Sequence, residues 1–418
     1  MTNLKMRILN IIIAFMLVSS TGGLLFVFNR NSSFLVLAVL IICSLLYIGK
    51  GIKKSIFYST CITFLVVFSL FSINFFFSIN PQSIDKYAFF GIIIFTTILA
   101  LLYFNNQENR YSFIDSLYFV LRLILYQSLI SFIAYFVIKD QLFLLTSKYH
   151  DTETFNYLFY YSIKEGSVVN LFGLDFHRNS GIFWEPGILQ VYLNILFFLE
   201  VSYFNRDKKL LGLIIIGILS TYSTTGLLLL IIQLIYFSQT ELKRYIPILL
   251  IILVSIPLYF ISSFNLNEKI YGDREFSFQK RLFDLTQPFF IALENPITGV
   301  GLDIVQFQKV REEFYINSNL NNILTEVGIQ QKLETTSKGS TNSIMYMLAG
   351  MGFPTTILFI FMFIKQKIII KHRFLWFIIS VLSVMSEPLL FKPFFLIFII
   401  SGFNYFFLKI INHNKQMA

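Results

Sequence analysis

The densest polar stretch beside an apolar run spans residues 177–187 and reads His-Arg-Asn-Ser-Gly-Ile-Phe-Trp-Glu-Pro-Gly. Pro186 suits the first position of a helix, which places Glu185 near the N-cap and Arg178 seven residues upstream. Helix N–H groups, the helix dipole and a bidentate guanidinium all favour phosphate oxygens, so this stretch could bind an anion. The alternative is structural, with Arg178 and Glu185 pairing with each other and capping the helix.

Further polar positions have residue types that suit a charged or sugar substrate. Arg281 follows a lysine beside a predicted amphipathic helix, Asn342 lies in a Ser-Thr-Asn-Ser stretch before a late apolar run, and Glu387 precedes a proline. Each also has an ordinary explanation, because arginines extend along interfaces and short polar side chains cap helices. Arg122 lies inside an apolar run, and either a buried functional charge or a paired or interface-seeking side chain would explain it.

Histidines and cysteines give no sign of metal or nucleotide chemistry. The four histidines have no ligand spacing, and no glycine-rich phosphate loop follows a strand. Cys43 and Cys61 both fall inside apolar runs and are interpreted as small core residues. We therefore expect no metal and no cofactor. An enzyme of this kind would need an already activated substrate, and a lipid-linked sugar diphosphate would suit an arginine-lined site.

The elements that must position these residues are membrane helices. Of 418 residues, 56% are hydrophobic, 13% are charged and 51 are Phe, and the mean hydropathy is +0.70. This composition argues against secreted or cytosolic enzymes and DNA-binding domains. The apolar runs have the length, about 17–25 residues, at which a helix crosses a bilayer, and they exceed the strands of an outer-membrane barrel.

We predict an all-α bundle of about twelve transmembrane helices that forms a single membrane domain over residues 1–418. The predicted spans lie near residues 8–28, 34–49, 55–79, 87–104, 116–138, 187–204, 210–223, 225–239, 245–264, 342–364, 374–386 and 393–408.

Basic residues predict the orientation of the bundle. With the N-terminus in the cytoplasm, 17 Lys and Arg fall in cytoplasmic segments, against Arg30, Lys86 and Lys392 in short outer loops. The positive-inside rule therefore places both termini in the cytoplasm, and this distribution argues against nucleic acid as a partner. The two long loops, about 140–186 and 265–341, then lie on the extracytoplasmic side. We expect the active site on that face.

The second long loop contains a predicted amphipathic helix at about residues 276–293. Asn295, Pro296 and the glycines that follow would end it. Such a helix would lie on the membrane surface or cap the bundle. Its apolar residues at three- and four-residue spacing are Phe278, Leu282, Leu285, Phe289 and Leu293.

Several short motifs follow one another along the chain from about residue 115 onward. They are Arg178-Asn-Ser-Gly-Ile-Phe-Trp-Glu185-Pro186, Ser220-Thr-Tyr-Ser-Thr-Thr-Gly226, Arg281 ahead of Asn295-Pro296-Ile-Thr-Gly299-Val-Gly301, Thr341-Asn342-Ser343 and Glu387-Pro388. In this order the chain resembles the bacterial O-antigen polymerase (Wzy-type) family, within the wider superfamily of O-antigen polymerases and ligases.

The resemblance implies a GT-C-like glycosyltransferase on the outer side of the bacterial inner membrane. Such enzymes of lipopolysaccharide or capsule biosynthesis transfer a growing glycan from undecaprenyl diphosphate to another lipid-linked repeat unit. The undecaprenyl-diphosphate-linked oligosaccharide, membrane lipid and a chain-length regulator are the implied partners. The family's functional arginines correspond to Arg178 and Arg281, which would bind the donor diphosphate and stabilise the leaving group.

The resemblance also suggests roles for the neighbouring polar residues. Glu185 would activate the acceptor hydroxyl or orient Arg178, and His177 is a weaker candidate for the base. We expect His177, Asn179, Asn342 and Glu387 to contribute to substrate binding.

Three other readings remain open. Ligases of the superfamily carry a histidine just before the Asn-Ser pair, where this chain has Thr341, which favours a polymerase over a ligase that has lost its histidine. A flippase would need charged residues at mid-membrane, and Arg122 is almost the only one. In a scaffold protein, the two loops would serve as binding surfaces alone.

Overall fold

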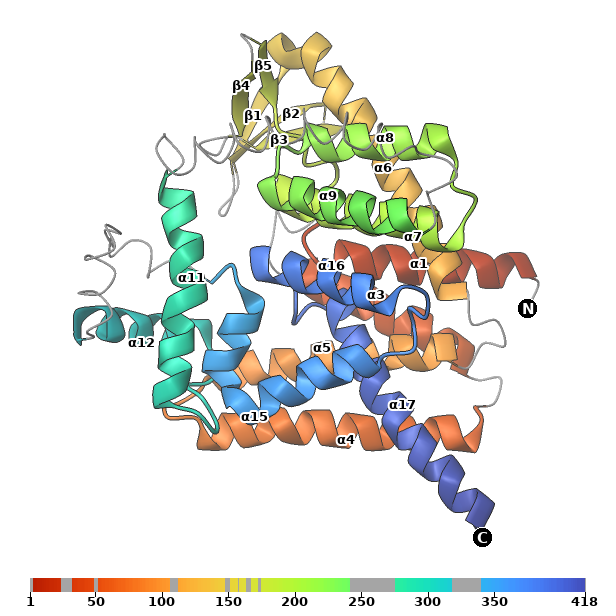
Figure 1. The fold of residues 1–418 in the computed structure, drawn as a ribbon, viewed down its shortest axis with the longest axis vertical. Coiled ribbons are helices and arrows are strands. Elements are labelled where there is room, and N and C mark those ends of the chain that lie inside the picture. Colours follow the sequence, from red (N-terminus) through yellow and green to blue (C-terminus); the bar gives the residue numbers. More distant parts are fainter. Residues whose placement is uncertain are drawn as a thin grey trace. The chain divides into compact units, whose positions relative to one another are not determined.

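The computed structural model describes residues 3–23, 32–48, 52–105, 112–146, 151–156, 158–162, 167–171, 174–240, 275–317 and 340–417. These residues contain thirteen α-helices and five short strands (Figure 1). They form two compact units whose segments alternate along the chain. The first unit takes Met1–Leu46, Gln107–Leu266 and Ile370–Ile379, and the second takes Tyr47–Asn106, Asn267–Ile369 and Ser380–Ala418.

The first unit is organised around α7, the most enclosed of its helices. Every residue of α7 from Pro186 to Ser202 is buried, and α6, α8 and α9 pack against it (Figure 1). A helix that is buried around its whole circumference lies in the centre of a bundle. The helices of this unit are α1 (Asn3–Ser19), α3 (Ser32–Ile48, up to Leu46), α6 (Ser112–Ile138), α7 (Pro186–Tyr203), α8 (Lys208–Ser220) and α9 (Thr224–Gln239).

A side-chain cap begins each of the two short helices α8 and α9. The carboxylate of Asp207 accepts a hydrogen bond from the Lys209 amide at 2.9 Å, and the Ser223 hydroxyl accepts one from the Gly226 amide at 3.4 Å. Each cap satisfies an amide that has no partner within its helix. The pair of short helices predicted over residues 210–239 is therefore confirmed as two helices.

Short strands form within the long loop predicted at about 140–186. After a 3-10 turn at Lys139–Gln141, an antiparallel sheet in the order β1-β2-β3 and a β4-β5 hairpin follow the end of α6 (Figure 1). The all-α prediction holds for the other described elements but misses this segment, because strands this short leave no long apolar run. The strands are β1 (Phe143–Thr146), β2 (Asp151–Phe155), β3 (Phe159–Ser162), β4 (Val168–Leu171) and β5 (Leu174–His177).

The second unit packs around α17. This helix lies against α4, α5 and α15, and α11 lies against α15. The helix α16 (Arg373–Ser386) begins in the first unit and ends in the second. The other helices of the second unit are α4 (Lys54–Phe77), α5 (Ile84–Asn105), α11 (Glu275–Glu294), α12 (Ile304–Asn317), α15 (Ser343–Lys365) and α17 (Pro393–Met417).

A break divides α15, and the loop after α11 fills it. Gly352 has φ 76° and ψ 173°, so the helical hydrogen bonds are interrupted there. The amides of Val300 and Gly301 donate to the carbonyls of Ala349 and Gly350, each at 2.9 Å. A backbone carbonyl without a partner is costly in an apolar environment, so these bonds stabilise the break. The Gly-Val-Gly motif therefore has a structural role.

In the part of the chain that the structure describes, six helices are long and apolar enough to cross a membrane, and the chain is a multi-pass helical membrane protein. Described helices overlap eleven of the predicted spans, but α1 ends at Ser19 and residues 20–23 are not helical, although the prediction continued this span to residue 28. The predicted span at 245–264 lies outside the described residues. The total of about twelve spans and the single membrane domain stay predictions. The six helices are Lys54–Phe77, Ile84–Asn105, Phe113–Gln141, Pro186–Tyr203, Ser343–Lys365 and Pro393–His413.

The two cysteines are less enclosed than predicted. Cys43 in α3 and Cys61 in α4 are free thiols, and both are half-buried rather than part of the core. One face of each of these helices is exposed, as in a helix that contacts lipid. A small apolar residue is suited both to such an exposed face and to the buried face.

Candidate functional site

Main-chain groups hold the polar stretch 177–187, which we call the first polar segment. The Asn179 amide nitrogen Nδ2 donates to the Ser220 hydroxyl at 2.9 Å and to the Ser128 carbonyl at 3.1 Å. Its backbone N–H donates to the Ser220 carbonyl at 2.9 Å, and its Oδ1 accepts from the Gly181 amide at 3.1 Å. Asn179 thus ties the entry of α7 to the end of α8, and these contacts favour a structural role.

His177 is enclosed between aromatic rings at the end of β5. Its Nε2 lies 2.7 Å from the Ser162 carbonyl oxygen and its Nδ1 lies 3.0 Å from that of Arg178, while the rings of Tyr135 and Tyr161 pack beside it. Burial lowers the pKa of His177, the two carbonyl contacts oppose this shift, and the charge of Arg178 adds to it.

Main-chain carbonyls also orient Arg178. Its amide donates to the Ser167 carbonyl at 2.8 Å, and its guanidinium Nε donates to the Thr221 carbonyl at 3.1 Å. The adjacent Tyr222 has φ 48°, in the left-handed region, which gives the turn between α8 and α9 its sharp bend. The half-buried guanidinium is thereby directed toward this turn.

Glu185 occupies the N-cap position of α7, and Pro186 is the first residue of the helix, as predicted. The carboxylate of Glu185 makes no capping hydrogen bond to the helix. The capping part of the structural alternative is therefore not the arrangement that forms. The half-buried Glu185 carboxylate lies at the helix entry.

Arg122 has aromatic partners on its own helix. Its guanidinium donates to the Tyr126 hydroxyl at 3.2 Å and lies over the Tyr118 ring at 5.5 Å. Of the two readings that the sequence left open, these contacts favour a paired side chain.

In the second unit, the predicted amphipathic helix forms as α11, which also carries the half-buried Arg281. Its apolar stripe is turned outward, since Leu285, Phe289 and Leu293 are 38%, 39% and 51% exposed. Ile291 is buried on the other face. The exposed stripe fits a helix lying against lipid.

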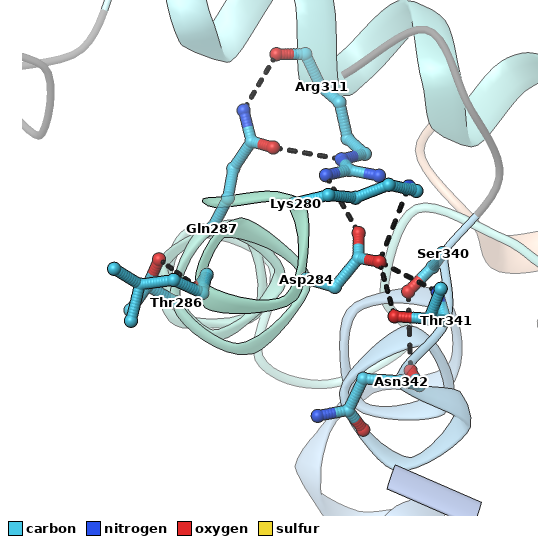
Figure 2. A network of polar contacts seen from close by, with 9 residues as sticks. Lys280, Asp284, Thr286, Gln287, Arg311, Ser340, Thr341 and Asn342 are labelled. Atoms are coloured by element: carbon cyan, nitrogen blue, oxygen red, sulfur yellow. Dashed lines mark hydrogen bonds and ion pairs between the residues drawn. The ribbon is translucent and has the colours of Figure 1, made fainter. Parts of the chain in front are cut away.

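That buried face carries charge. Asp284 and Arg311 are both fully buried, and the Arg311 guanidinium lies 3.1 Å from Asp284 Oδ1. Asp284 Oδ2 accepts hydrogen bonds from the backbone amide and the hydroxyl of Thr341, each at 2.7 Å, and from Lys280 Nζ at 3.4 Å (Figure 2). We call the set Lys280, Asp284, Gln287, Arg311 and Thr341 the Asp284 cluster.

Gln287 and Arg311 hold each other reciprocally within the Asp284 cluster. Arg311 Nε donates to Gln287 Oε1 at 2.8 Å, and Gln287 Nε2 donates to the Arg311 carbonyl at 2.9 Å (Figure 2). Burial lowers the pKa of the Arg311 guanidinium, and Asp284 opposes that shift. Lys280 also pairs with Asp284, so two cationic side chains, those of Lys280 and Arg311, share this one carboxylate.

The remaining predicted residues lie around the start of α15. Asn342 is its N-cap, and its side-chain oxygen accepts from the Met345 amide at 3.1 Å. Glu387 is buried, and its main-chain carbonyl accepts from the Ser343 hydroxyl at 2.9 Å. The capping explanation of Asn342 is therefore confirmed, and the role of either residue in substrate binding stays a prediction.

The structure brings the predicted residues together only in part. His177, Arg178, Asn179 and Glu185 lie in the first unit, and Arg281, Asn342 and Glu387 in the second. No group of three or more His, Cys, Asp or Glu side chains in the described part of the chain is arranged to hold a metal ion.

Sequence reasoning missed Asp284, Gln287 and Arg311. The one local signal for them is the four-residue spacing of Lys280 and Asp284, which places opposite charges on one helix face. The charged residues of α12 carried no signal of their own.

Fold and site together define a multi-pass helical membrane protein with arginines in the polar segments between its apolar helices. A family model described as O-antigen ligase matches residues 210–360, more than a third of the chain. This match confirms the resemblance to the superfamily of O-antigen polymerases and ligases. It includes Arg281 and the Asp284 cluster, whereas Arg178 and Glu185 lie outside it. No curated protein gives a significant match.

Proposed function

We propose that this protein is a glycosyltransferase that polymerises a bacterial polysaccharide, of the O-antigen or capsule type. It would transfer a growing glycan from undecaprenyl diphosphate to another lipid-linked repeat unit. The observation that carries this proposal is that Arg281 and the buried ion pair of Asp284 with Arg311 lie within the residues that match the family model.

The chemistry of the transfer suits such a site. The bond between the anomeric carbon and the diphosphate oxygen breaks, a bond to the acceptor hydroxyl oxygen forms, and the hydroxyl proton leaves. Diphosphate is already a good leaving group, so the enzyme must mainly orient the reactants and stabilise charge. In this proposal Arg178 and Arg281 bind the diphosphate, and Glu185 takes the proton or orients Arg178. No metal or other cofactor enters the proposed step.

The other predicted residues shape the site in this proposal. His177 and Asn179 fix the backbone on either side of Arg178 through the main-chain contacts described above. Asn342 fixes the start of α15, and Glu387 supports it through its carbonyl. A sugar ligand would contact the backbone beside Arg178 and the start of α15, which these residues hold in place.

The proposed location is the bacterial inner membrane, with both termini cytoplasmic and the site on the outer face. The bias of 17 basic residues against three supports this orientation. The exposed apolar stripe of α11 supports contact with lipid at the same face. Lipid-linked oligosaccharide, membrane lipid and a chain-length regulator are the proposed partners.

A ligase is the second candidate, because the matching family model is described as O-antigen ligase. Thr341, at the position where the ligases of the resemblance carry histidine, favours the polymerase. Gene deletion separates the candidates on a gel of the cell's glycans. Loss of a polymerase leaves one repeat unit on the lipid core, and loss of a ligase leaves none. Loss of a flippase instead accumulates lipid-linked repeats on the cytoplasmic side.

Complementation of the deletion strain tests the two arginines. We expect Arg178→Ala and Arg281→Ala each to lower chain extension on the order of 10²–10³-fold, because each removes a charge donor to the leaving group. Arg→Lys should restore little if the contact is bidentate. Lys309→Ala, at an exposed lysine of α12, is the control and should extend chains like the wild type. Glycan of wild-type length from either arginine variant at matched protein level would contradict the assignment.

A further inference from the structure

Thr341 has an unusual pair of hydrogen bonds for a residue that precedes a helix. Both its backbone N–H and its hydroxyl donate to one carboxylate oxygen, Asp284 Oδ2, at 2.7 Å each (Figure 2). Asp284 is fully buried, whereas Thr341 is half-buried, so part of this residue is exposed.

These bonds fix the polarity of the Thr341 hydroxyl. A hydroxyl has one proton and two lone pairs, and here the proton is given to Asp284. Asp284 cannot reverse the bond while it forms ion pairs with Lys280 and Arg311, because an ionised carboxylate only accepts. A ligand that approaches Thr341 therefore meets lone pairs, and it must donate a hydrogen bond.

The neighbouring polar side chains are used within the second unit itself. Ser340 donates its hydroxyl to the Asn342 carbonyl at 3.3 Å, Asn342 caps α15, and Ser343 donates to the Glu387 carbonyl. Of the four residues in this Ser-Thr-Asn-Ser stretch, Thr341 is the one whose hydroxyl is oriented by a carboxylate from another helix.

We propose that Thr341 accepts a hydrogen bond from a hydroxyl of the acceptor sugar, and that Asp284 is the positioning residue that keeps the Thr341 oxygen in its accepting orientation. This inference rests on the proposed function and assigns the acceptor side of it. Ionised phosphate oxygens only accept, so the donor diphosphate would be repelled by the lone pairs of Thr341. The diphosphate belongs with the cationic side chains, and Thr341 recognises a neutral hydroxyl.

Chain extension by the purified protein tests this assignment. Membranes of the gene-deletion strain supply the accumulated lipid-linked repeat units, and full-length variants are compared in one lipid preparation. We expect Thr341→Val, which keeps the side-chain shape, to lower kcat/KM about tenfold, equivalent to about 1.4 kcal/mol. Thr341→Ser, which keeps the hydroxyl, should stay within about twofold of the wild type.

Thr286→Val is the matched control. The Thr286 hydroxyl is half-buried on the same helix as Asp284, but it donates to the Leu282 carbonyl one turn earlier at 2.9 Å (Figure 2). We expect this variant to extend chains at the wild-type rate. Melting temperatures of all variants are measured in parallel, and rates are compared only among variants that melt together.

A double-mutant cycle tests the role of Asp284. If Asp284 acts through Thr341, Asp284→Asn should lower kcat/KM in the wild-type background and change it little in the Thr341→Val background. Fully additive effects would overturn the positioning role. Because Asp284→Asn also disturbs an ion pair, the comparison of Thr341→Val with Thr341→Ser stands as the independent test.

The outcomes separate the two proposals. If the wild type does not extend the repeat units, the proposed function fails and this inference fails with it. If the wild type extends them and Thr341→Val does so equally well, or Thr341→Ser is as impaired as Thr341→Val, the acceptor role of Thr341 is wrong while the polymerase stands.

Discussion

The first polar segment and the Asp284 cluster hold polar side chains by different means. In the first polar segment, Asn179 and His177 bind mainly to backbone carbonyls, which any residue at the partner position would supply. In the Asp284 cluster, charged side chains from α11 and α12 bind each other, and Asp284 also binds Thr341, which lies two residues before α15. A backbone carbonyl remains available as a hydrogen-bond partner when the residue that carries it is substituted. A charged side chain is removed by the substitution. The two regions should therefore respond differently to mutation.

The largest effect is expected where one charge of the Asp284 cluster is removed. Asp284→Ala or Arg311→Ala alone should lower the free energy of unfolding by about 3–5 kcal/mol, because each leaves a buried charge without its partner. The double change Asp284→Ala with Arg311→Ala should cost less than the sum of the two single changes, because neither charge is then left without its partner. Thermal and denaturant unfolding in detergent, followed by fluorescence, measures these values. Additive losses in the double variant would show that the charges do not depend on each other.

A second prediction concerns main-chain contacts in the second unit. Gly301 has φ 95°, and a Cβ there would overlap the Gln82 side-chain amide, so Gly301→Ala should cost about 3 kcal/mol. Gly212→Ala in α8 is the matched control, since nothing lies within 4 Å of the added carbon. It should gain about 0.5–1 kcal/mol from helix propensity. Equal losses in both variants would refute this account of the loop at the α15 break.

Substitution of Asn179 tests the hydrogen bonds that hold the first polar segment. Asn179→Ala removes three side-chain hydrogen bonds and should cost about 1–3 kcal/mol, less than a single change in the Asp284 cluster. Asn295→Ala is the control, because its amide makes one local bond, to the Ile291 carbonyl at 3.0 Å. The same unfolding assay applies. A loss above that of Arg311→Ala would reverse the comparison between the two regions.

The smallest expected effect depends on pH and on His177. Because burial lowers its pKa in the folded state, the unfolded chain binds more protons as the pH falls through about 6.5. Stability is therefore lost on acidification below that value. The melting temperature of the wild type should fall more than that of His177→Gln between about pH 7.5 and pH 5. Parallel curves for the two proteins would contradict this assignment.

The sequence by itself determined the features that depend on local composition. The long apolar runs gave the membrane helices, Pro186 gave the start of α7, and Asn342 gave the start of α15. It also gave the limits of α11 within one residue of those observed. Each of these follows from hydrophobic burial or from a helix cap, which depend on residues close together in the chain.

Tertiary structure decided which polar groups meet. The Thr341 hydroxyl and its acceptor Asp284 are 57 residues apart, and Gln287 and Arg311 are 24 apart, so no local pattern specifies either pair. The tertiary structure also decided which face of α11 is buried. The apolar stripe defined by periodicity is exposed, and the buried face carries Asp284 and Gln287. A buried charge is stable only beside its partner, and the partner is supplied by a fold that brings distant helices together.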